Sequence, residues 1–82
     1  MTTSAQISVY PLRQEHLGPA VESVRSALEE QGLTPQVGPM STTVTGASGI
    51  MFAALAEAFA KVATTGQVVM TITISNACPV PS

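Results

Sequence analysis

This sequence has few charged residues, no tryptophan and no aspartate. Charged side chains make up 10% of its 82 residues, against roughly 25% in an average soluble domain. Three cationic side chains and five glutamates give a formal charge of −2, and the cationic residues do not cluster. The composition therefore argues against nucleic-acid binding, which needs a positively charged surface.

Reactive side chains are equally scarce. Cys78 is the only cysteine, His16 is the only histidine, and they fall on different predicted elements. One thiol excludes an internal disulfide and fits a reducing compartment. One histidine and one cysteine cannot supply the four ligands of a metal site, and a catalytic constellation is hard to build from so few groups. We therefore expect no catalysis, no metal and no cofactor.

The sequence predicts neither a membrane span nor a targeting segment. The first six residues are polar and lack the cationic and apolar regions of a signal peptide. No apolar run reaches the length of about 18 residues that a transmembrane helix needs. We expect a cytoplasmic protein with one domain, residues 1–82. So few charges on so small a domain also predict a homo-oligomer, either a dimer or a tetramer.

Hydrophobic periodicity and turn residues predict the order strand, helix, strand, strand, helix, strand. The predicted strands cover Ala5–Leu12, Leu33–Val37, Met40–Thr45 and Gln67–Asn76. The first predicted helix covers His16–Gln31, and the second opens within 46–49, with Ser48 as N-cap, and ends at Gly66. With right-handed crossovers, this order predicts an α+β, ferredoxin-like sandwich. Its antiparallel four-stranded sheet would have the first and third strands central and both helices on one face.

Apolar residues at helical spacing predict the core. In the first helix they are Leu17, Ala20, Val21, Val24 and Leu28, and in the second they are Met51, Leu55, Ala58, Phe59 and Val62. Three methionines, Met40, Met51 and Met70, are also predicted to point inward.

Strand alternation predicts a second, hydroxyl-rich face. Ile7 and Val9 oppose Ser8 and Tyr10. Two further sets alternate in the same way: Met40, Thr42 and Val44 against Ser41, Thr43 and Thr45, and Val68, Met70, Ile72 and Ile74 against Thr71, Thr73 and Ser75. The uncovered face would carry hydroxyls, one tyrosine and almost no charge. Such a surface suits a neutral or weakly cationic heteroaromatic ligand, or another sheet.

Three segments carry a family resemblance: Ser8–Leu12 (SVYPL), Val37–Gly46 (VGPMSTTVTG) and Ser75–Pro79 (SNACP). In these segments the chain resembles the small YkoF-related thiamine-binding proteins, and the middle segment is the most specific. The resemblance implies a ferredoxin-like fold, assembly through the sheets, and binding of thiamine or its hydroxymethylpyrimidine moiety without catalysis.

The resemblance also implies ligand contacts, which the chemistry of the residues supports. By position, the implied contacts are Ser8, Ser41, Thr42 and Thr43, together with the turn that contains Ser75, Asn76 and Cys78. Hydroxyls and the Asn76 amide match the donors and acceptors of an aminopyrimidine, and Tyr10 can stack on its ring. No lysine or arginine is predicted on this face, which favours thiamine or hydroxymethylpyrimidine over thiamine diphosphate.

Each candidate also has a purely structural interpretation. Serine and threonine pack well in strands, and Tyr10 can fill an oligomer interface. Thr42 has the inward register of Val44 and would need a bulge or a twist at the strand end to reach a ligand. Asn76 suits a turn, and Cys78 suits a small buried site. Two functions therefore stay open: a ligand-binding module, and a structural module whose open face pairs with another copy.

Overall fold

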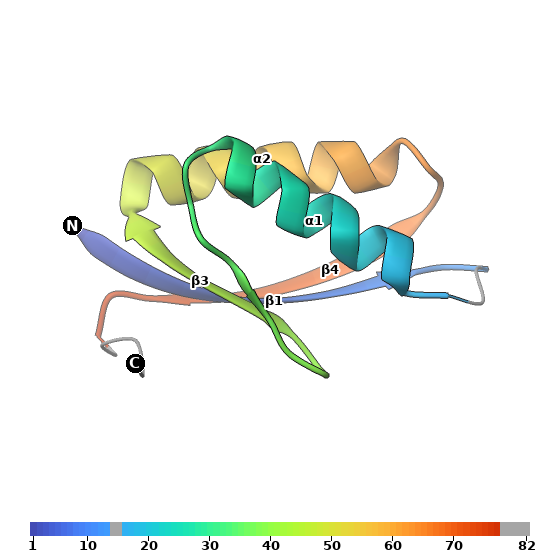
Figure 1. The fold of residues 1–82 in the computed structure, drawn as a ribbon, viewed down its shortest axis with the longest axis horizontal. Coiled ribbons are helices and arrows are strands. Elements are labelled where there is room, and N and C mark those ends of the chain that lie inside the picture. Colours follow the sequence, from blue (N-terminus) through green and yellow to red (C-terminus); the bar gives the residue numbers. More distant parts are fainter. Residues whose placement is uncertain (14–15, 78–82) are drawn as a thin grey trace.

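The structure is a computed structural model that describes residues 1–13 and 16–77. Its elements in chain order are β1 (Thr2–Pro11), α1 (Gly18–Glu30), β2 (Gln36–Val37), β3 (Thr42–Ala47), α2 (Ser48–Ala63) and β4 (Val68–Ser75). All neighbouring strands are antiparallel, in the order β2-β3-β1-β4, and both helices lie over one face (Figure 1). The predicted ferredoxin-like fold and its central first and third strands are confirmed.

The two faces of the sheet follow from alternation along β1. Ala5, Ile7 and Val9 are buried beneath the helices, whereas the residues between them point to the opposite side. The register continues this division across the sheet, since Ile7 lies between Thr42 of β3 and Ile72 of β4. We call the side without helices the open face.

Helix α1 ends where Gly32 adopts a left-handed conformation, with a φ of 86°. The Gly32 N–H donates to the Glu29 carbonyl (2.9 Å), and the Leu33 N–H donates to the Leu28 carbonyl (3.1 Å). These two bonds form a Schellman motif, and Leu33 packs against the core. The motif takes Leu33 out of the predicted strand, so β2 retains only Gln36 and Val37.

Helix α2 begins without the predicted side-chain cap. Ala47 is its N-cap and makes no side-chain cap hydrogen bond, while the Ser48 N–H donates to the Met1 carbonyl at 2.9 Å. The prediction that Ser48 caps this helix is therefore wrong. The backbone of the first residue takes the place of the expected side chain.

Most of the predicted core is buried, with three exceptions. Leu28, Met51 and Val62 are fully buried, whereas Met40 is 81% exposed. The Gly38 N–H donates to the Ser41 carbonyl at 2.8 Å, which closes a turn and removes Met40 from the strand. Leu17 and Phe59 are also exposed rather than core residues. Leu17 is the N-cap residue of α1, and Phe59 is not among the buried residues of α2.

Candidate functional site

The open face is uncharged in its described strands and mostly polar, with Val69 beside Tyr10 as an exposed apolar residue. Paired strands align its side chains in rows, and one row runs from Gln36 through Thr43 and Gln6 to Thr73. Another row joins Ser8 to Thr71. Within the described residues, none of the four strands contains a charged side chain. The predicted hydroxyl-rich surface is therefore present.

At one end of this face, β1 extends farther than its neighbour β3. Pairing between the two strands stops at Ile7 and Thr42, so residues 8–11 of β1 have no β3 partner among the described residues. The 38–41 turn and the first half of α1 border this gap. The gap gives access from the open face to the layer between sheet and helices.

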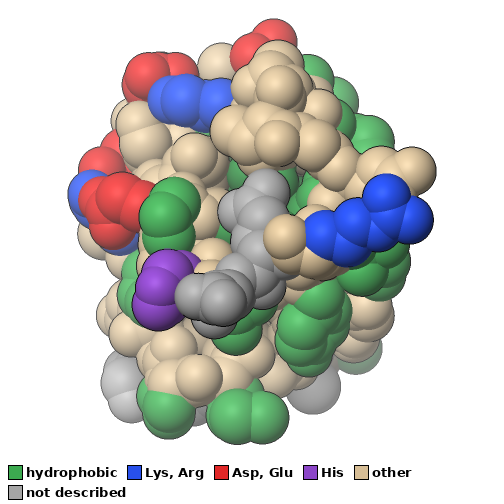
Figure 2. Space-filling view, turned by 90° about the vertical axis from the view of Figure 1, so that its right-hand side faces the viewer, with side chains coloured by type: hydrophobic (Ala, Val, Ile, Leu, Met, Phe, Trp, Pro, Cys, Tyr) green, Lys and Arg blue, Asp and Glu red, His purple; other side chains and the backbone are tan. Residues whose placement is uncertain are grey.

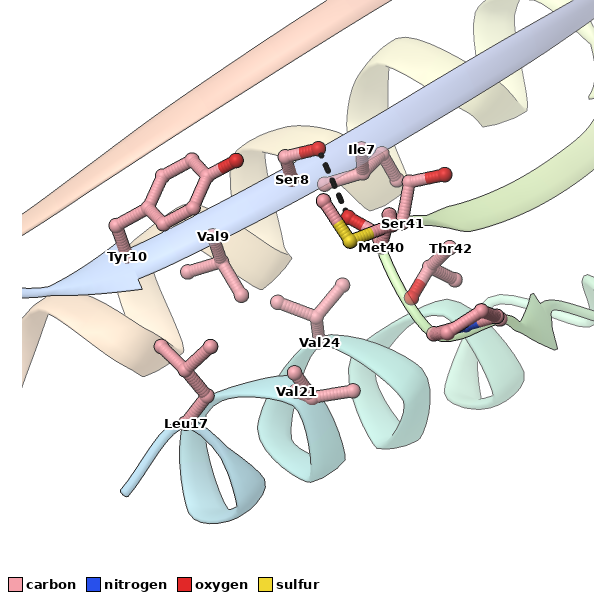
Figure 3. Close-up of a pocket in the computed structure, with 12 residues that line it drawn as sticks. Ile7, Ser8, Val9, Tyr10, Leu17, Val21, Val24, Met40, Ser41 and Thr42 are labelled. Carbon is pink, nitrogen blue, oxygen red and sulfur yellow. Dashed lines mark hydrogen bonds between the residues drawn. The ribbon is translucent and has the colours of Figure 1, made fainter. Parts of the chain in front are cut away.

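A small cavity occupies the gap, and we call it the edge cavity. Its volume is about 60 Å³. The lining residues are Ile7, Ser8, Val9, Tyr10, Leu17, Val21, Val24 and residues 38–42. Figure 3 shows the apolar side chains of α1 on one side of it, and Ser8, Tyr10 and Ser41 on the other. An apolar interior therefore meets a rim that can donate and accept hydrogen bonds.

Two side-chain hydrogen bonds hold the 38–41 turn beside β1. The Ser8 hydroxyl donates to the Met40 carbonyl at 3.4 Å (Figure 3), and Gln6 Nε2 donates to Ser41 Oγ at 3.1 Å. Met40 is mostly exposed and Tyr10 is exposed, and both line the mouth of the edge cavity. The turn is thus held through the Met40 carbonyl and the Ser41 hydroxyl, while the Met40 side chain is exposed to solvent.

Thr42 lines the edge cavity from the helix side of the sheet, which the sequence did not predict. The β1–β3 register is regular up to Thr42, so no bulge turns its side chain outward. Thr42 is buried, yet it lines the cavity, because the cavity extends to the helix side of the sheet. Thr42 therefore lines the edge cavity without a bulge in the strand, and its contact with a ligand stays a prediction.

Thr43 lies apart from these residues. Its side chain is exposed on the open face, between Gln6 and Gln36 in the sheet register. It lines a shallow depression that also involves Thr34 and Thr45. Thr43 therefore belongs to the open face but not to the edge cavity.

Ser75 and Asn76 lie at the opposite end of the sheet. They border an open depression of about 470 Å³, the terminal hollow, with Met1, Thr3, Ser48, Phe52 and Ile74. Ser75 Oγ accepts a hydrogen bond from the Ala77 N–H at 2.9 Å, and Asn76 Nδ2 donates to Met1 Sδ at 3.2 Å. Cys78 falls outside the described residues.

The predicted site residues thus divide into two groups. Ser4 of β1 pairs with Ser75, whereas Ser8 pairs with Thr71. Four residues along a strand separate the two ends by about 13 Å. Sequence reasoning missed Gln6, Leu17 and Val21 as neighbours of the first group. Gln6 could have been found, because it shares the outward register of Ser8 and Tyr10.

The charged residues of the helices lie away from both ends of the open face. Arg25 forms ion pairs with Glu22 and Glu29 along α1, and Lys61 of α2 contacts Glu30. These pairs are exposed and contribute little to stability. In the described residues, neither helix is long and apolar enough to cross a membrane.

Comparisons with solved structures reproduce this fold. A hypothetical protein from Methanocaldococcus jannascii aligns with a TM-score of 0.84 and 20% identity, over 98% of this chain and 84% of that one. A Streptococcus pneumoniae protein aligns with a TM-score of 0.82 and 25% identity, over 92% and 86%. A Thermotoga maritima protein, described as a candidate for thiamine biosynthesis or salvage, aligns with a TM-score of 0.79 and 20% identity, over 90% and 82%.

Sequence comparison identifies the family. No curated protein matches the chain. Residues 5–77 match the family described as thiamine-binding protein, and this range covers five of the six structural elements in full and most of β1. The resemblance seen in the three short segments is therefore confirmed over nearly the whole chain. The chain belongs to the thiamine-binding protein family.

Proposed function

We propose that this protein binds thiamine or its hydroxymethylpyrimidine moiety at the edge cavity, without catalysing a reaction. Membership of the thiamine-binding family supports a thiamine-related role. The observation that supports the location is the meeting of Ser8, Tyr10 and Ser41 around an uncharged cavity with an apolar interior. Residues 1–82 would act as one binding domain, in the cytoplasm.

The residues around the edge cavity fit the chemistry of an aminopyrimidine. The ring is flat and apolar on its faces, and its amine and ring nitrogens donate and accept hydrogen bonds at its edge. Tyr10 can stack on one face, while the hydroxyls of Ser8 and Ser41 can adapt as donors or acceptors. Residues 8–11 of β1 also present backbone groups that β3 leaves unpaired.

The ligand must widen the edge cavity to enter it. Ligand pockets commonly measure about 300–1,000 Å³, and the cavity measures about 60 Å³. We propose that the Met40 side chain moves aside, because it is exposed, unbranched and flexible. A second copy placed against the open face would supply a further wall, which agrees with the self-association that we propose for this weakly charged chain.

The same site should discriminate against phosphorylated ligands. Among the described residues, no lysine or arginine lines the edge cavity. Phosphate groups are usually bound by guanidinium groups, ammonium groups or helix N-termini. We therefore expect thiamine and hydroxymethylpyrimidine to bind more tightly than thiamine diphosphate.

Thermal melting with each of the three compounds at millimolar concentration tests this proposal. A ligand present at about 100 times its Kd adds roughly 2.7 kcal/mol to the free energy of unfolding, which raises the Tm of a small domain by several degrees. Thiamine and hydroxymethylpyrimidine should raise the Tm, and Tyr10→Ala should reduce the rise more than Asn76→Ala. The absence of a shift with all three compounds would contradict the proposal.

One observation favours a second candidate function. In the described strands, the open face is uncharged at both ends and not only around the edge cavity. A module that associates through this face, without a small-molecule ligand, would have the same surface. An unchanged Tm together with concentration-dependent association would favour this structural function.

A further inference from the structure

We propose that the backbone N–H and C=O of Val9 bind the amine and the adjacent ring nitrogen of the aminopyrimidine, and so determine which ring the edge cavity accepts. This inference rests on the proposed function, because it assigns a recognition group within the same cavity. Val9 lines the edge cavity, and its side chain is buried. The direction of its backbone groups follows from the hydrogen bonds of β1.

Hydrogen bonds at both ends of β1 fix the direction of its backbone groups. The Leu12 N–H donates to the Gln67 carbonyl at 2.9 Å, which continues the register between β1 and β4. The Ser48 N–H donates to the Met1 carbonyl at 2.9 Å, which continues the register between β1 and β3. Successive residues of a strand direct their backbone groups to alternate sides. Even-numbered residues of β1 therefore point toward β4, and odd-numbered residues point toward β3.

Val9 points to the side on which β3 is missing. The β1–β3 register would place Met40 opposite Val9, but pairing stops at Ile7 and Thr42. Met40 lies instead in the turn before β3, and its carbonyl accepts a hydrogen bond from the Ser8 hydroxyl at 3.4 Å. Among the described residues, no other backbone group takes the place of Met40 as a partner of Val9.

The other residues of the β1 extension offer less to a ligand in the gap. Ser8 and Tyr10 are even-numbered, so their backbone groups are paired with β4. Pro11 is odd-numbered but has no N–H, so its backbone can only accept. Within residues 8–11, Val9 is therefore the one that presents both a donor and an acceptor to the gap.

An aminopyrimidine matches this pair of backbone groups. Its amine can donate to the Val9 carbonyl while the adjacent ring nitrogen accepts from the Val9 N–H, as a neighbouring strand would. The ring would then lie in the plane of the sheet, in the place that β3 occupies farther along β1. Leu17 and Val21 of α1 would cover one face of the ring, and Tyr10 would cover the other (Figure 3).

The surroundings leave recognition to neutral hydrogen bonds. In Figure 2, which shows the end of the molecule at the right of Figure 1, no lysine, arginine or glutamate side chain is seen near the bottom, on the side of the strands. In the part of the chain that the structure describes, no charged side chain lines the edge cavity. A backbone N–H and C=O in such surroundings distinguish a donor from an acceptor, because a group left unpaired there costs affinity.

This assignment predicts selection against an oxo ring. Replacing the amine by a carbonyl oxygen places a proton on the adjacent ring nitrogen, so that donor and acceptor exchange positions. Such a ring can pair with Val9 only when it is turned over, which exchanges the positions of its methyl and methylene substituents. We therefore expect the oxo analogue of thiamine to bind at least about tenfold more weakly than thiamine.

Amide hydrogen exchange of the isotope-labelled full chain tests the assignment, with Val37 as the matched control. The Gly38 N–H donates to the Ser41 carbonyl, so the N–H of Val37 points away from β3, toward the free edge of β2. Both valine N–H groups should exchange rapidly in the free protein, unlike that of Ile7. Saturating thiamine should slow exchange at Val9 by about tenfold or more and leave Val37 unchanged.

Ester variants test the donor separately from the side chain. In full-length protein assembled by peptide ligation, the α-hydroxy acid that corresponds to valine replaces Val9 in one variant and Val37 in the other. Each ester removes an N–H that lies outside the ladder and weakens one carbonyl within it, so the two variants are matched. Calorimetry should show about tenfold weaker thiamine binding for the Val9 ester, and unchanged binding for the Val37 ester.

The outcomes separate this inference from the proposed function. Saturable thiamine binding with rapid exchange at Val9, or with equal affinity for the oxo analogue, would overturn the inference and leave the proposed function standing. A folded Val9 ester with wild-type affinity would do the same. Slow exchange at Val9 in the free protein would overturn the inference without any ligand, and a failure of thiamine to bind would overturn both.

Discussion

The two ends of the open face share one chemistry but differ in shape. At the Ser8 end, β1 extends beyond its last pair with β3. The 38–41 turn and α1 border the gap that this leaves beside β1. At the Ser75 end, Ser4 still has partners on both sides, Thr45 and Ser75, and the terminal hollow is open to solvent. Hydroxyl side chains therefore do not by themselves define a site. Because β1 and β3 differ in length, one part of the open face becomes a partly enclosed cavity.

The largest expected effect is a loss of stability on truncating Ile7, the core residue that lies between the two ends of the open face. Ile7 lies on β1 between the two ends, fully buried beneath the helices. Ile7→Ala should lower the free energy of unfolding by about 2–5 kcal/mol, because it leaves a cavity in the core. Denaturant unfolding measures this loss. The control is Val37→Ala, at an exposed edge position, which should cost less than about 0.5 kcal/mol. If Val37→Ala lowered the free energy of unfolding as much as Ile7→Ala, the β2 edge at Val37 would have to be covered rather than exposed.

The second prediction concerns thiamine affinity and distinguishes the Ser8 end of the open face from the Ser75 end. Tyr10→Ala should weaken thiamine binding about tenfold, which corresponds to roughly 1.4 kcal/mol, because the ring loses its stacking partner. Tyr10 is exposed, so the fold should be preserved. Titration calorimetry measures the affinity, and far-ultraviolet circular dichroism checks the fold. An unchanged affinity would exclude Tyr10 from the site.

A smaller effect is expected from the hydroxyl at the same end. Ser8→Ala removes a group that contacts the Met40 carbonyl and lines the edge cavity. A neutral hydrogen bond contributes about 0.5–1.5 kcal/mol, so we expect thiamine affinity to fall by a few-fold. Ser8→Thr keeps the hydroxyl and should retain more of the affinity than Ser8→Ala. The opposite order would argue that this position acts through its size.

The smallest effect is expected at the other end of the open face. Asn76→Ala removes a hydrogen bond to Met1 Sδ in an exposed turn. The free energy of unfolding should change by less than about 0.5 kcal/mol, and thiamine affinity should stay within about twofold of wild type. Calorimetry under the conditions used for Tyr10→Ala gives the comparison. A loss as large as that of Tyr10→Ala would move the proposed site to the terminal hollow.

The sequence predicted the fold well because its strands and helices have clear and different periods. Alternation in β1 and β4 assigned the faces, and Gly32 marked the end of α1 as expected. The errors lie where distant parts of the chain decide the local structure. The Met1 backbone stands at the start of α2 in place of a Ser48 cap, and the turn that begins at Gly38 exposes Met40.

The sequence predicted residues that do line the candidate site, but it did not predict that the candidates divide into two separate groups. Ser8, Tyr10, Ser41 and Thr42 do lie together. Their separation from Ser75 and Asn76 depends on how far β1 extends beyond β3, which is a property of strand register. Register is set by tertiary pairing, so local patterns could not place the two groups at opposite ends.

An amide chemical-shift titration of the isotope-labelled full chain with thiamine tests the central claim most directly. The measurement reports both whether the ligand binds and which end of the open face it contacts. We predict saturable shifts at Ser8, Tyr10 and Ser41, with small changes at Ser75 and Asn76. Shifts confined to Ser75 and Asn76, or no shifts at millimolar thiamine, would contradict binding at the edge cavity.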